Sequence, residues 1–96
     1  MPSSQPKLIC RVAETFSIRG RGLVLAPEAA LPEGVVIRIG DAVTLRLPDG
    51  RIVETRINAL ELLTPNPKHL VPMMLESIVE KSEAPVGSEV WTRPAQ

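Results

Sequence analysis

Ten prolines and six glycines are scattered through this 96-residue chain. Proline lacks the backbone N–H that a helix needs, and glycine weakens a helix interior, so long helices have little room here. Breakers at such short intervals are typical of short strands joined by tight turns. We therefore expect one all-β domain over residues 7–93, with a flexible N-terminal tail at 1–6 and a C-terminal tail at 94–96.

The clearest pair of strands lies in the middle of the chain. Val43, Leu45 and Leu47 alternate with polar residues, and a similar alternation returns over residues 53–57. Between them, residues 48–50 read Pro-Asp-Gly, in which proline presets φ and glycine accepts the left-handed region. This pattern predicts an antiparallel hairpin with one face buried and the other in water.

Shorter patterns indicate the remaining elements. Residues 7–15 alternate like a strand with one buried face, and the apolar run 23–25 is typical of a strand buried on both sides. Prolines predict loops over 26–34 and 64–72. We also expect strands at 35–39 and 89–93 and turns at 20–22, 40–41 and 84–87.

One segment, residues 73–81, fits two structures. Met74, Leu75, Ile78 and Val79 recur at helical spacing, whereas every second residue from Met73 to Val79 also fits a strand. Intrinsic propensity favours the helix. We nevertheless favour the strand, because a known barrel that other segments of the chain resemble implies one here.

The charge balance argues against some classes of partner. Eleven basic and eleven acidic residues give a net charge of zero, so no overall field draws the chain to nucleic acid or anionic lipid. The N-terminus does not read as a signal peptide, and no apolar run has the length that spans a bilayer. We expect a cytoplasmic protein whose lone cysteine, Cys10, packs as a small hydrophobe.

Residues of the kind that carry catalysis or bind cofactors are scarce. Gly20 and Gly22 flank Arg21, but neither the lysine of a phosphate-binding loop nor a third glycine follows. His69 is the one histidine and lies in a proline-rich loop, where we expect it to be solvated. We therefore expect no enzyme, no cofactor and no metal site.

Four segments occur in the order found in a known barrel. Residues 14–22, 37–43, 56–61 and 86–90 resemble the second domain of elongation factor Tu and of the other translational GTPases. The block from Phe16 to Gly22 is the most specific of them. This resemblance implies a small closed antiparallel β-barrel of about six to seven strands. The loop at 26–34 is longer than the family pattern, and residues 64–81 match it poorly.

The resemblance also implies positions of interest. In elongation factor Tu one face of this barrel helps to hold the aminoacylated end of tRNA, and Ile18 and Glu61 are matching positions, with Glu14 near a third. Ile18 and Glu61 also fit plain core and strand-end roles, and we expect Phe16 in the core. Phe16, Gly20 and Gly22 match barrel positions. The family's nucleotide lies on another domain, so we expect no GTP binding here.

Contact with a partner is the leading hypothesis. Arg19 and Arg21 on a turn, with Arg38, Arg46 and Arg56 on outward positions, would form a basic face for RNA if they gathered; otherwise they keep the sheet soluble. Trp91 is a candidate contact with a partner protein. We therefore expect a non-catalytic interaction module that contacts RNA (tRNA or the ribosome) or a protein. The alternative is a structural, homodimeric protein without a nucleic acid role.

Overall fold

The computed structural model describes residues 5–61 and 64–93, so most of the expected N-terminal tail and the C-terminal tail at 94–96 lie outside the described residues. Within these ranges the strands are β1 (Leu8–Ile18), β2 (Gly22–Pro27), β3 (Ala42–Arg46), β4 (Ile52–Leu60), β5 (Met73–Leu75) and β6 (Glu89–Thr92). A short 3₁₀ helix, η1 (Lys81–Glu83), precedes the last strand.

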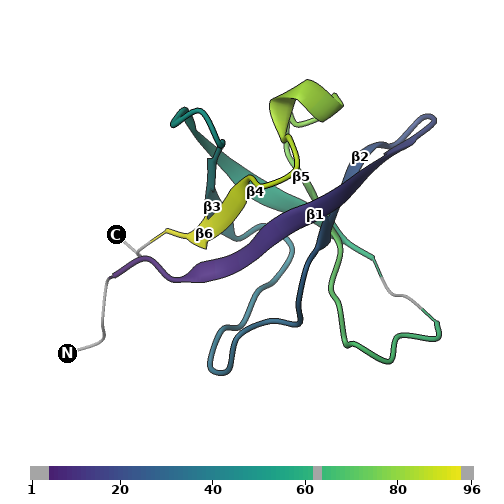
Figure 1. Cartoon of the computed structure of the whole chain (residues 1–96), viewed down its shortest axis with the longest axis vertical. Coiled ribbons are helices and arrows are strands. Elements are labelled where there is room, and N and C mark those ends of the chain that lie inside the picture. Colours follow the sequence, from purple (N-terminus) through teal and green to yellow (C-terminus); the bar gives the residue numbers. More distant parts are fainter. Residues whose placement is uncertain (1–4, 62–63, 94–96) are drawn as a thin grey trace.

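The strands close into an antiparallel barrel in the order β1-β2-β5-β4-β3-β6 (Figure 1). This confirms the expected fold class. Neighbours along the chain pair in the hairpins β1–β2 and β3–β4, whereas β6 lies between β1 and β3 and joins the two ends of the sheet. Closure is a common way for a small β protein to avoid edge-to-edge association, although here the end of β1, from Ala13 to Ile18, pairs on one side only, with β2.

The central hairpin forms as predicted. Val43 lies opposite Thr55 and Leu45 opposite Val53. The backbone N–H of Leu47 donates to the carbonyl of Arg51 at 2.9 Å, which closes the turn, and Gly50 adopts a φ of 95°. Val43, Leu45 and Leu47 are buried, as the alternation predicted.

Strand β1 is shared by two neighbours. Its first part, Leu8 to Arg11, pairs with β6, and from Val12 onward it pairs with β2. The β1–β2 ribbon therefore extends beyond the closed part of the barrel (Figure 1) and ends in the turn at residues 19–21. Gly20 lies in this turn and Gly22 begins β2 directly after it, with φ angles of 79° and 123°, in the left-handed region that glycine enters without strain.

The ambiguous segment contains a strand, as we favoured. Strand β5 pairs with β4 along its length and with β2 at one position, Leu25 opposite Met73. All three of its residues are buried. Met74, on the opposite face to Met73 and Leu75, lies against the ribbon's end, with Sδ 3.8 Å from Arg21 Nη2. The chain then turns at Glu76 and Ser77, so no α-helix forms over the helically spaced residues.

Two predictions from the sequence are wrong, the strand at residues 35–39 and the start of the loop at residue 26. Residues 35–39 form no strand, because their backbone meets no partner strand; Val35 and Ile37 still pack against the core, whereas Val36 and Ile39 are exposed. The loop expected from residue 26 begins two residues later. Pro27 ends β2 opposite Val12, at a place where β5 no longer pairs with β2, so proline's missing N–H breaks no ladder there.

The core fills the barrel interior. Its fully buried members come from every strand of the barrel: Ile9, Val12, Leu23, Leu25, Val43, Leu45, Ile57, Met73 and Val90. Cys10 packs with them, as predicted, and burial, with a smaller contribution from the Glu28 carboxylate, raises the pKa of its thiol to about 12. Among the described residues, no helix has the length and apolar character that are needed to cross a membrane.

Candidate functional site

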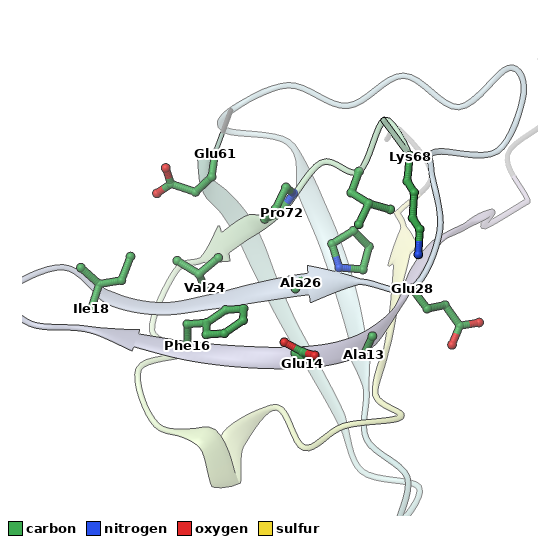
Figure 2. A pocket seen from close by; sticks show the side chains of 12 residues that line it. Ala13, Glu14, Phe16, Ile18, Val24, Ala26, Glu28, Glu61, Lys68 and Pro72 are labelled. Atoms are coloured by element: carbon green, nitrogen blue, oxygen red, sulfur yellow. The ribbon is translucent and has the colours of Figure 1, made fainter. Parts of the chain in front are cut away.

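A groove with a volume of about 650 Å³ lies between the outer face of the β1–β2 ribbon and the segment that follows β4 (Figure 2). Three stretches of chain supply its lining. The ribbon contributes Ala13, Glu14, Phe16, Ile18, Val24, Ala26 and Pro27; the next residue, Glu28, extends it; Glu61, Lys68, Leu70 and Pro72 form the opposite side.

The floor of the groove follows from strand geometry. Glu14, Phe16 and Ile18 are spaced two residues apart, so their side chains lie on the same face of β1. The register places Ala26 opposite Glu14 and Val24 opposite Phe16. Cross-strand partners of this kind lie side by side, and together they form a largely apolar surface (Figure 2).

A bulge in β1 explains why Phe16 faces the groove and not the core. Val12 lies opposite Pro27 and Glu14 opposite Ala26, so β1 has one more residue than β2 at Ala13. One extra residue reverses the faces of all the residues that follow it. The core position expected for Phe16 is therefore wrong: the side chain is 50% exposed.

The opposite wall is ordered by hydrogen bonds. The N–H of Glu61, directly after β4, donates to the carbonyl of Pro72 at 2.9 Å. The side chain of Asn66 donates to the carbonyl of Leu70 at 2.7 Å and accepts from its N–H at 3.0 Å. Thus Leu70 and Pro72 hold their places across from β1, although residues 64–72 form a loop as predicted.

Two ion pairs lie at the borders of the groove. Arg21 Nη2 lies 2.6 Å from Glu61 Oε1, so the ribbon's turn is tied to the end of β4. At the other end, Arg11 Nη1 lies 3.5 Å from Glu28 Oε1.

Three of the positions chosen by the resemblance meet at this site. Phe16, Ile18 and Glu61 line one groove, although more than forty residues separate Glu61 from the other two in the chain. Gly20 lies in the adjoining turn, and Gly22 begins β2 directly after it. A Cβ built on Gly22 would lie 3.3 Å from Met74 Cε, so this position also suits a residue without a side chain.

The predicted basic residues lie in three separate places. Arg19 and Arg21 are in the turn of the β1–β2 ribbon; Arg56 reaches the carbonyl of Gly40 at 3.1 Å and so lies beside the turn that follows Arg38; Arg46 is on β3. Within the parts of the chain described here, these five arginines do not gather around the groove.

Trp91 already has partners within the chain. The Arg46 guanidinium lies 4.8 Å from the centre of the Trp91 ring, a cation–π contact. The indole N–H donates to Glu89 Oε1 at 3.1 Å. The pKa of the Glu89 carboxyl is lowered, mainly by the hydrogen bond from Arg11 and next by the one from Trp91. The expected partner contact at Trp91 would have to form beside this cluster.

Potential catalytic side chains are dispersed. His69 is exposed in its loop, as expected, and Cys10 is buried in the core. Over residues 5–61 and 64–93, no three His, Cys, Asp or Glu side chains come together in a way that would hold a metal ion.

Sequence reasoning missed the wall and part of the floor of the groove. Leu70, Pro72 and Lys68 lie in a segment where the family pattern is weak, and no spacing in the sequence pairs them with β1. The signal for the outward turn of Phe16 was present at Glu14, because a charged residue two positions before the aromatic indicates a face in contact with water.

Comparison of the chain with models of protein families, with curated proteins and with solved structures finds no match.

Proposed function

We propose that this protein is a non-catalytic interaction module of the kind formed by the second domain of the translation factors, and that it acts in the cytoplasm. The groove beside β1 is its binding surface. The observation that supports this most strongly is that Phe16, Ile18 and Glu61, chosen from the sequence by that resemblance, line one groove.

The chemistry of the groove suits binding. Its volume falls within the range of about 300–1,000 Å³ that is usual for ligand sites, and a largely apolar surface with a few polar groups is typical of them. Phe16 is held by its strand yet half exposed, so a partner gains apolar contact there without rearranging the barrel. A half-exposed aromatic in a concave surface is the kind of residue that dominates binding energy.

Photo-crosslinking tests the site while the partner is still unidentified. The photoreactive residue p-benzoylphenylalanine is placed at position 16, and at position 36 as the control, since Val36 is apolar and 69% exposed but lies outside the groove. We expect a discrete crosslinked species from position 16 and none from position 36. Equal labelling from both positions, or none from position 16, would refute the proposal.

A second candidate function, a structural homodimer, is favoured by residues 35–39. This segment is β-branched, lacks partner strands, and exposes Val36 and Ile39. The N–H groups of Val35 and Arg38 already donate to Pro32 and Asp41, and antiparallel pairing of two copies would add backbone bonds along the rest of the segment. Light scattering of the purified protein, compared with the Val36→Lys variant, tests this: a dimer that Val36→Lys separates supports it, and a monomeric parent protein excludes it.

A further inference from the structure

The proposed function leaves open which class of molecule enters the groove. The floor of the groove offers apolar contacts but few polar groups that would select a ligand. Phe16, Ile18, Val24 and Pro72 present carbon atoms to the groove, and Leu70 adds to them from the loop. A ligand that fills this floor must bring apolar groups of its own.

The charges around the groove cancel. Its lining carries three carboxylates, on Glu14, Glu28 and Glu61, and one ammonium, on Lys68. Arg21 offsets Glu61 at 2.6 Å, and Arg11 is shared between Glu28, at 3.5 Å, and Glu89, at 2.9 Å. The charges left over are those of Glu14 and Lys68, which have no ion-pair partner within residues 5–61 and 64–93 and which are opposite in sign.

This balance discriminates between RNA and protein. An RNA strand carries one negative charge per nucleotide, and proteins bind it with an excess of Lys and Arg along its path. The groove provides no such excess, and the arginines Arg38, Arg46 and Arg56 lie elsewhere. RNA bound here would leave phosphates without cationic partners and close to the groove's carboxylates. A neutral, apolar protein segment has neither disadvantage.

We infer that the occupant of the groove is an apolar protein segment without net charge, and this inference rests on the proposed function. Phe16 is its main apolar contact. Glu14 accepts hydrogen bonds from the segment's N–H groups, and Lys68 donates to its carbonyls. A ligand without net charge complements a groove whose own charges balance, and this balance disfavours highly charged competitors.

Two parallel selections on the purified protein test the inference. A phage-displayed library of random peptides and a pool of random single-stranded RNA are each selected on the immobilised barrel. Binders are then retested on Phe16→Glu and Leu70→Glu, which place a charge in the groove, and on Val36→Glu, the matched control outside it. Thermal unfolding first establishes which variants are folded. If Phe16→Glu is not folded, the variant in the loop, Leu70→Glu, tests the groove in its place.

We expect the peptide selection to yield apolar sequences of low net charge. Their affinity should fall by about tenfold or more in the groove variants and stay unchanged in Val36→Glu. It should change by less than about twofold between about 50 and 200 mM salt, whereas neutralisation of two RNA phosphates would weaken binding by about sevenfold over that range.

Other outcomes overturn the inference in distinguishable ways. Strongly charged peptides would contradict an occupant without net charge. An RNA binder that is lost in the groove variants would leave the proposed function standing and assign its ligand to RNA. If neither selection yields a groove-dependent binder, the inference fails, and the crosslink from position 16 decides whether the proposed function fails with it.

Discussion

Replacing Phe16 by alanine should cost little stability, because its side chain is already half in water. Full burial of a phenylalanine is worth about 1.5–3 kcal/mol, so half of that burial in a residue that is 50% exposed contributes about 1 kcal/mol. No closed cavity forms, since the groove is open to solvent. For a domain of this size, that loss lowers Tm by about 4–8 °C.

Leu25→Ala provides the matched comparison on the neighbouring strand. Leu25 is fully buried and lies opposite Met73 at the one position where β2 pairs with β5. Removing a buried leucine side chain costs about 3 kcal/mol or more, because a cavity is left behind. Urea unfolding followed by circular dichroism should therefore separate the two variants by about 2 kcal/mol. If Phe16→Ala costs as much as Leu25→Ala, Phe16 is a core residue and the reasoning about the bulge is wrong.

Three further predictions follow from the same structure. Arg21→Gln removes a partly exposed ion pair and should cost less than about 1 kcal/mol; a double-mutant cycle with Glu61→Gln in urea checks this, and a larger coupling would contradict it. The thiol of Cys10 should resist alkylation at pH 8, because its pKa is raised from 9.0 to about 12. The neutral, buried thiol therefore stabilises the fold fully below pH 9, and this stabilisation is lost as the pH rises toward 12. Denaturant titrations should show a fall of up to about 1.4 kcal/mol per pH unit that Cys10→Ala lacks; an equal fall in both would refute it. Gly22→Ala should cost more than Gly20→Ala in thermal unfolding, because both have positive φ but only Gly22 has close neighbours; equal losses would count against this packing.

The hairpin and the barrel were predictable from local patterns. The alternation at 43–47 and 53–57 specifies both register and buried face, since a shift by one residue would turn every apolar side chain outward. The resemblance of the block from Phe16 to Gly22 then added closure, which no local pattern contains. The closed six-strand order confirms that expectation within the described residues.

The misplaced elements share a cause in tertiary structure. Residues 35–39 have strong β propensity, but a strand needs a partner, and β4 and β6 already flank β3. Phe16 was misplaced because one extra residue at Ala13 reverses the face, and the charge of Glu14, on the same face as Phe16, was the one sign of this in the sequence. The far wall of the groove depends on the path of residues 64–72, which prolines predict only as a loop.

An NMR titration with the selected ligand gives the most direct test of the groove as a binding surface. We expect the backbone amide signals of Phe16, Ile18 and Glu61 to shift together and to saturate at one ligand concentration, because distant parts of the chain form one site. The amides of Val36 and Ile52, which are exposed outside the groove, should stay unchanged. Shifts confined to those two regions, with Phe16, Ile18 and Glu61 unmoved, would show that the protein binds its partner elsewhere.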